Sequence, residues 1–320
     1  MKKIIAILLC LTLLSGLTAL LAGCKTGPIT TADNNGTTIV VTSPAAHALV
    51  RPLVQNYTED GGTSVVTIIP LYKLGQDSHS FEPTTKDIIN LANADVVICT
   101  GSESWLNAAL QSSGNTVARV VSMMDACDVH AVEHDHDHSQ EDSFCALIEN
   151  DEHVWLAVDN ATLIVIAITN TLKEADPDNA SVWDKHCEAF KADLIALNAE
   201  FHDAVRSSTK KTVVIADRHP FVHLFGHLGL DCIPAFPGCS SETSASFETQ
   251  TKLIEAVRSH ELSYIFVIEG SDGKVAQVVA AETGAEILTL NSLQVVSDYE
   301  DIDYIAVMRR NLENLQKALQ

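Results

Sequence analysis

Basic residues are scarce in this chain of 320 residues. It has 20 lysines and arginines against 42 aspartates and glutamates, a formal charge of −22. So acidic a chain repels phosphate backbones, which argues against nucleic acid as a partner, and it attracts cations. Aromatic residues make up only 5%, but an apolar content of 46% indicates a folded chain long enough for two domains.

Several chemical motifs are also missing. The chain has no Cys-x-x-Cys pair, H-E-x-x-H helix, G-x-S-x-G elbow or P-loop, so thiolate zinc sites, helical metalloproteases and the common hydrolases and nucleotide enzymes have no support. We expect no catalytic residue and no enzyme; a zinc hydrolase with an open fourth position is the less favoured alternative. Disulfides between Cys127 and Cys145 and between Cys232 and Cys239 fit an exported chain, but the sequence does not fix the pairing.

No long uncharged apolar run occurs after residue 22. Residues 4–22 are apolar and follow two lysines, the pattern of an export signal. Residues 21–24, Leu-Ala-Gly-Cys, resemble the bacterial lipobox. We therefore expect a signal peptide over residues 1–23, lipidation of Cys24, and a polar tether over residues 24–36 that holds the protein at the outer face of the cell membrane. A retained N-terminal membrane span is the alternative.

Strand-like and helix-like runs alternate along the rest of the chain, which predicts an α/β fold with parallel sheets flanked by helices. We expect an N-terminal lobe over residues 37–177, a C-terminal lobe over residues 208–320, and one long, stiff helix over residues 178–207 that joins them. The apolar positions of that helix recur in steps of four and three, which gives a single stripe. They are Trp183, Cys187, Phe190, Leu194, Leu197, Phe201 and Ala204.

Residues 75–83, Gly-Gln-Asp-Ser-His-Ser-Phe-Glu-Pro, separate a strand-like run from a helix-like run. His79 therefore lies on a strand-to-helix loop, where α/β folds place ligands. His153 and His219 also lie on loops. Three neutral imidazoles on such loops can converge on one cation, so we predict a metal site formed by His79, His153 and His219.

Histidine alternates with acidic residues in the stretch that follows residue 127. A polar tract of this composition does not pack into a core and is typical of weak metal capture. We expect an auxiliary metal-binding loop over residues 128–142, with a solvated acidic loop as the alternative. Its histidines are His130, His134, His136 and His138. We expect His47, His223 and His227, which lie in helices, to be packing or surface residues. We expect His186, His202 and His260 to lie at solvated helix positions.

These pieces together resemble the metal-binding lipoproteins of bacterial zinc and manganese ABC importers, over nearly all of the mature chain. Residues 75–83 are similar to the family motif G-x-D-P-H-x-[YF]-E-P, and residues 151–156, Asp-Glu-His-Val-Trp-Leu, to D-P-H-x-W-L. The histidine-rich insert is typical of the zinc-transporting members. The resemblance implies two α/β lobes joined by one long helix, with the metal site in the cleft between the lobes.

The chain departs from the family pattern near each ligand. Ser78 and Glu152 stand where the family has prolines. The family's third histidine corresponds to Arg218, and His219 follows one residue later; we expect His219 to be the ligand, with Arg218 in that position as the alternative.

The fourth ligand is open between Glu269, Gln294 and a water. Three imidazoles favour Zn²⁺ over the oxygen-preferring Mn²⁺. The resemblance implies capture of this cation outside the membrane and delivery to a cognate ABC permease, and we expect a monomer. A surface adhesin is the alternative function.

Overall fold

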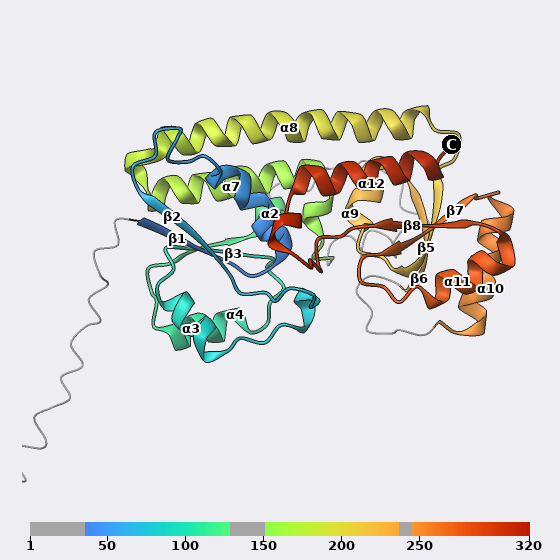
Figure 1. The fold of residues 1–320 in the computed structure, drawn as a ribbon, viewed down its shortest axis with the longest axis horizontal. Coiled ribbons are helices and arrows are strands. Elements are labelled where there is room, and N and C mark those ends of the chain that lie inside the picture. Colours follow the sequence, from blue (N-terminus) through green and yellow to red (C-terminus); the bar gives the residue numbers. More distant parts are fainter. Residues whose placement is uncertain (1–35, 129–150, 237–244) are drawn as a thin grey trace, which may run out of the picture. The chain divides into compact units, whose positions relative to one another are not determined.

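The computed structural model describes residues 36–128, 151–236 and 245–320. Residues 36–320 form one compact unit with two lobes, each built on a four-stranded parallel sheet (Figure 1). The N-terminal sheet has the order β2-β1-β3-β4, with strands β1 (Gly36–Val41), β2 (Val65–Pro70), β3 (Val96–Cys99) and β4 (Arg119–Ser122). The C-terminal sheet has the order β6-β5-β7-β8, with strands β5 (Thr212–Arg218), β6 (Asp231–Phe236), β7 (Tyr264–Ile268) and β8 (Glu286–Leu290). The predicted α/β class with two lobes is confirmed.

The two sheets share one topology. In each of them the first strand in sequence lies between the next two, so β1 separates β2 from β3 and β5 separates β6 from β7. The chain therefore turns to opposite sides after those first strands, which opens a crevice at their carboxyl ends. Thr42 and Thr100 follow β1 and β3, and Glu269 follows β7. These positions are where a ligand site is expected.

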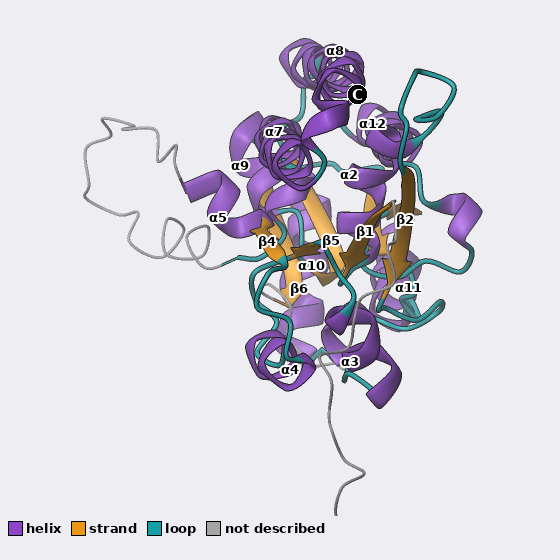
Figure 2. Ribbon diagram, turned by 90° about the vertical axis from the view of Figure 1, so that its left-hand side faces the viewer, coloured by secondary structure: helices purple, strands orange, loops and turns teal. Residues whose placement is uncertain are grey.

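The described part of the N-terminal lobe has five helices: α2 (Pro44–Val54), α3 (Thr85–Ala92), α4 (Leu106–Ser113), α5 (Met123–Asp128) and α7 (Val158–Ala175). Figure 2 shows α2 and α7 on one side of the strands and α3 and α4 on the other. The start of α2 is fixed locally, because Ser43 Oγ accepts a hydrogen bond from Ala46 N at 3.2 Å and proline occupies the first helical position. Helix α5 has no counterpart in the sequence prediction, since its six residues are too few to show a helical period.

The predicted linking helix is α8 (Ala180–Ser207), a single helix of 28 residues that runs past both lobes (Figure 1). It follows a 3₁₀ turn, η3 (Pro177–Asn179). The predicted apolar stripe is buried, except that Val205 rather than Ala204 completes it. His186 is also buried and contacts the carbonyl oxygen of Leu53 at 2.6 Å. Its predicted solvated position is therefore wrong, because α8 packs closely against α2 there.

The C-terminal lobe carries α9 (Val222–Leu228), α10 (Phe247–Ser259), α11 (Lys274–Thr283) and α12 (Tyr304–Ala318). Helix α9 ends at Gly229, whose φ of +66° is a conformation that glycine adopts without strain. Helices α7, α8 and α12 lie side by side above the sheets, as Figures 1 and 2 both show. Within the described ranges, no helix combines the length and the apolarity that a membrane crossing requires.

The two lobes and α8 share the largest of the three buried apolar clusters among the described residues, and each lobe has a smaller one of its own. The same buried cluster contains Ile39 from β1, Leu197 from α8 and Phe266 from β7. Hydrogen bonds also cross between the lobes: Trp155 Nε1 donates to the Ser292 carbonyl at 2.9 Å, and the Tyr304 hydroxyl donates to the Trp155 carbonyl at 2.7 Å. The loops that carry the predicted ligands are therefore held against a common interior.

Candidate metal centre

His79 lies in a single 3₁₀ turn, η1 (Ser78–Ser80), between β2 and α3. Asp77 caps this turn, because one carboxylate oxygen accepts from both the backbone N of His79 at 3.0 Å and its Nδ1 at 2.7 Å. A hydrogen bond that fixes the proton on Nδ1 leaves Nε2 as the atom for a metal. Contacts with His79 and Arg218 outweigh the effect of burial and hold the pKa of Asp77 well below its usual range. Asp77 is therefore an anion that orients His79.

His153 repeats this arrangement. Asp151, two residues before it, accepts from its backbone N at 3.0 Å and contacts its Nδ1 at 2.9 Å. His153 is fully buried, and its Nε2 makes a short contact with the side-chain amide nitrogen of Gln294 from the other lobe. Nδ1 of His153 donates a hydrogen bond to Asp151. Nε2 therefore carries the lone pair, which accepts a hydrogen bond from the Gln294 amide. In both Asp-x-His motifs the aspartate contacts Nδ1, which leaves Nε2 as the ring nitrogen that faces the site.

His79 and His153 converge on one point together with Glu152. Their ligand atoms all lie within 4.8 Å of one another, and the two imidazole ring centres are 5.7 Å apart. Two nitrogen donors and one carboxylate oxygen make a donor set that suits Zn²⁺. Of the three predicted histidine ligands, the structure thus brings these two together.

Glu152 is a residue that the sequence analysis noted as a departure but did not identify as a ligand. One of its oxygens makes a short contact with His79 Nε2, and the other accepts from the Ser102 hydroxyl. Burial would raise the pKa of this carboxyl, but the contacts with His79 and Ser102 outweigh it, and the pKa lies below its usual value. The signal in the sequence was a carboxylate next to a predicted ligand, in place of a rigid proline.

Arg218 and His219 take different positions. Arg218 Nη1 donates to the second oxygen of Asp77 at 3.0 Å. A guanidinium has no lone pair for a metal, so Arg218 acts on the site through Asp77. His219 is buried, and burial lowers its pKa to about 4, with a smaller opposing effect from Asp151. The ring is therefore neutral at pH 7.

His219 does not belong to the group formed around His79. Its ring packs against Phe225 with 5.5 Å between centres. Its Nδ1 is buried and has no hydrogen-bond partner among the residues that the structure describes. A buried ring nitrogen without a partner is costly unless something else satisfies it. His219 as the third ligand stays a prediction.

The two protein side chains considered for the fourth ligand differ in their surroundings. Glu269 accepts from Ser292 N at 2.8 Å, from Ser292 Oγ at 2.7 Å and from Gln294 N at 3.0 Å, and burial raises its pKa. This carboxyl is occupied in holding the loop after β8. Gln294, on that loop, reaches His153 directly. An amide turned by 180° would present its oxygen to the same point.

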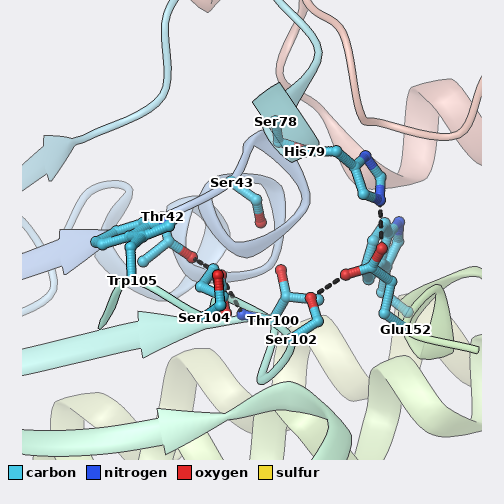
Figure 3. Close-up of a pocket in the computed structure, with 11 residues that line it drawn as sticks. Thr42, Ser43, Ser78, His79, Thr100, Ser102, Ser104, Trp105 and Glu152 are labelled. Atoms are coloured by element: carbon cyan, nitrogen blue, oxygen red, sulfur yellow. Dashed lines mark hydrogen bonds and ion pairs between the residues drawn. The ribbon is translucent and has the colours of Figure 1, made fainter. Parts of the chain in front are cut away.

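A cavity of about 170 Å³ opens beside His79 and Glu152. It lies at the crevice between the carboxyl ends of β1 and β3, and Figure 3 shows His79 and Glu152 in its wall. Hydroxyl groups, which are neutral oxygen donors, come from six of the eleven residues that line it. They belong to Thr42, Ser43, Ser78, Thr100, Ser102 and Ser104.

Other predicted sites lie outside the described residues. These are the lipidated Cys24, two of the cysteines in the predicted disulfides, Cys145 and Cys239, and the auxiliary loop histidines His130, His134, His136 and His138. They stay predictions.

Comparisons with known proteins identify the family and the fold of the chain. A family model described as "Zinc-uptake complex component A periplasmic" matches residues 39–318. The high-affinity zinc uptake system protein ZnuA of Bacillus subtilis is 30% identical over 249 residues, which cover 76% of this chain and 77% of that protein. A zinc-binding protein AdcA of Streptococcus pyogenes is 27% identical over 293 residues, 87% of this chain but only 55% of that longer protein.

Solved structures give the same answer for the fold. The metal-dependent lipoprotein YcdH of Bacillus subtilis superposes with a TM-score of 0.72 at 26% identity, over 89% of this chain and 100% of that one. The Zn(II)-bound ZnuA-like domain of Streptococcus pneumoniae AdcA has a TM-score of 0.68 at 22% identity, over 89% and 99%. The likeness to this second structure concerns the fold alone.

Proposed function

The chain belongs to the family of periplasmic zinc-uptake complex components, and from that premise we propose that it captures Zn²⁺ outside the cell membrane and delivers it to an ABC permease. The observation that carries this proposal is the convergence of His79, Glu152 and His153, each imidazole held by its own aspartate. The names of its relatives, a zinc uptake protein and a zinc-binding protein, support the same cargo.

The proposed ligands are His79, His153 and His219, with Glu152 as an additional anionic donor. In the metal-free protein both ring nitrogens of His79 face carboxylates, from Asp77 and Glu152. This arrangement suits a doubly protonated imidazole. Zinc binding then releases the proton from Nε2, and the cation takes over the charge that the proton supplied.

His219 and Gln294 bring the second lobe into the proposed site. The side-chain amide nitrogen of Gln294 occupies the lone pair of His153 Nε2. A metal ion that binds Nε2 displaces this amide nitrogen. His219 is neutral and has an unpaired buried nitrogen, so it enters the shell without having to lose a proton. Ligands from both lobes make the bound cation a link between them.

Nitrogen donors favour Zn²⁺, whereas the carboxylate of Glu152 also suits Mn²⁺. We propose Zn²⁺ because at least two of the donors are imidazoles in every combination of ligands considered. The protein is proposed to act as a monomeric lipoprotein, anchored through Cys24 and working with a membrane permease; it is a binding component and not a catalyst.

Competition titrations with a zinc chelator and with Mn²⁺ test this proposal. His79→Ala and His153→Ala each remove a proposed ligand, so the affinity for Zn²⁺ should fall by more than about 100-fold, since even outer partners of a ligand are worth ~10–100-fold. His260→Ala changes an exposed histidine at the end of α10 and is the matched control.

Deletion of residues 128–142 should leave the tight site intact. Growth of cells in chelated medium should depend on the same two histidines. Unchanged zinc affinity in both alanine variants would contradict the proposed site, and normal growth without the protein would contradict its role in uptake.

A further inference from the structure

A second group of metal-ligating side chains lies where α7, α8 and α9 meet. Asp159 comes from the first turn of α7, His202 from α8 and His227 from the last turn of α9. His227 Nε2 contacts Asp159 Oδ2 at 2.6 Å, and the rings of His202 and His227 are 5.1 Å apart, centre to centre. Three consecutive helices thus bring two imidazoles and a carboxylate together.

The spacing of the two rings fits a shared cation. Two imidazoles bound to one tetrahedral zinc ion through bonds of ~2.0–2.1 Å have ring centres about 5 Å apart. The rings of His202 and His227 are at this spacing, with an interplanar angle of 65°. The corresponding distance in the central site, between His79 and His153, is 5.7 Å.

Asp159 is placed to orient His227 rather than to bind the metal. Among the described residues, only the group around His79 brings three ligand atoms within 4.8 Å of one another, so direct coordination here falls to the two imidazoles and water. The contact of Asp159 with Nε2 leaves Nδ1 of His227 with the lone pair, the carboxylate–histidine arrangement that metal sites use. Asn198, one turn before His202 on α8, donates to the other oxygen of Asp159 at 2.6 Å.

This group is open to solvent and separate from the central site. The side chain of His227 is 34% exposed and that of Asp159 is 52% exposed, whereas His153 is fully buried. His227 lies four residues after His223 on α9, which is about 6 Å along the helix. His223 Nε2 in turn donates to the Asp151 carbonyl at 2.8 Å, so the surface group lies about one helical turn from the residues that support His153.

We propose that His202 and His227, with Asp159 as a positioning residue, bind a second divalent transition metal ion at the surface. Two imidazoles and water favour nitrogen-preferring ions such as Zn²⁺, Cu²⁺ and Ni²⁺ over Mg²⁺. The site holds its ion more weakly than the buried one, because water supplies the rest of the shell. It does not depend on the proposed uptake function, since no residue is shared with the central group.

Histidine modification followed by mass spectrometry tests this site residue by residue in the full chain. At a Zn²⁺ concentration about ten times the Kd, the modification rates of His202 and His227 should both fall by about tenfold, because about one protein in eleven keeps the site empty. Mg²⁺ at the same concentration should change neither rate. His260, exposed at the end of α10, should react equally with and without zinc.

Two variants test whether His202 and His227 bind the same metal ion or are protected independently of each other. In His202→Gln, zinc should no longer protect His227, and in His227→Gln it should no longer protect His202, while protection of His79 persists in both. In Asp159→Asn, the zinc concentration that gives half-maximal protection of the two rings should rise by about tenfold or more. The site is refuted if zinc leaves both rates unchanged, if Mg²⁺ protects equally, or if either ring stays protected when its partner is replaced. If zinc protects His202 and His227 but does not protect His79, the result contradicts the proposed central site and leaves the surface site standing.

Discussion

Arg218 at the end of β5 donates a hydrogen bond to Asp77 in the other lobe, with 3.0 Å between Nη1 and Oδ2. The second oxygen of Asp77 holds Nδ1 of His79 at 2.7 Å. One carboxylate thus connects the C-terminal lobe to a proposed metal ligand of the N-terminal lobe. The orientation of His79 therefore depends on where the second lobe lies.

Replacing this arginine should loosen the metal. In Arg218→Gln, Asp77 loses its cationic partner and His79 becomes less well oriented, so we expect the affinity for Zn²⁺ to fall by roughly tenfold, mainly through faster release. Stopped-flow mixing of the zinc-loaded protein with excess chelator measures the release rate. Arg309→Gln, which removes a surface ion pair with Glu200 at 3.4 Å, is the control and should change nothing. Equal rates in all three proteins would show that the link between the lobes does not act on the metal.

Glu152 gives a second prediction. Glu152→Gln keeps the shape of the side chain but removes the charge that faces His79. We expect zinc affinity to drop by about 10–100-fold, and fewer protons to be released on binding, because the imidazole loses the anion that favours its protonated form. Calorimetry in two buffers of different ionisation enthalpy measures both quantities. Glu248→Gln on the exposed start of α10 is the matched control. A variant with full affinity would remove Glu152 from the proposed ligands.

A substitution at Gln294 is expected to tighten metal binding. The amide of Gln294 reaches His153 Nε2, so Gln294→Glu places a carboxylate at the same point. Because affinity for divalent cations rises with the number of charged ligands, we expect zinc to bind about tenfold more tightly and Mn²⁺ to gain at least as much. Gln294→Met keeps the volume but has no carboxylate, and it should show no gain. Tighter binding in both variants would mean that the amide only competes with the metal.

The metal-free protein should become less stable in mild acid. His47 Nδ1 lies 2.6 Å from the Tyr72 hydroxyl, and burial, with a smaller effect of Arg51, lowers the pKa of His47 to about 4. In the unfolded chain an imidazole has a pKa of about 6.5, so between these values the unfolded state binds a proton that the folded state does not. The free energy of unfolding therefore falls as the pH drops through this window, by up to ~3 kcal/mol for this one residue.

Urea denaturation at pH 7.5 and 4.5 measures this loss. His47→Gln cannot take up the proton in either state, so its stability should change less between the two pH values than that of the wild type. His260→Gln, which alters an exposed histidine, should lose as much stability between the two pH values as the wild type does. If His47→Gln loses as much stability as the wild type, the acid sensitivity resides elsewhere, with buried His219 next in line because its pKa is lowered to the same value.

Much of the fold could be predicted from periodicity. The stripe from Trp183 to Phe201 is long enough to define α8 without any knowledge of its neighbours. Alternating strands and helices likewise gave the two parallel sheets. Short elements such as α5 could not be predicted, nor the burial of His186, because both depend on what packs against them.

The site could be predicted in its parts but not in its connections. His79 and His153 were found from their loops, and each carries an aspartate two residues earlier that turned out to hold its Nδ1. The contacts of Arg218 with Asp77 and of Gln294 with His153 join residues 141 positions apart in each case. Pairings of that kind follow from the docking of the two lobes, which no local pattern encodes.

The interior shared by both lobes has a consequence for how the molecule melts. Since β1, α8 and β7 all contribute to one buried cluster, neither half keeps a complete interior when the other is lost, so heating should give one calorimetric peak instead of two. Cutting the chain after α8 should yield fragments that fail to fold alone and regain structure only when mixed.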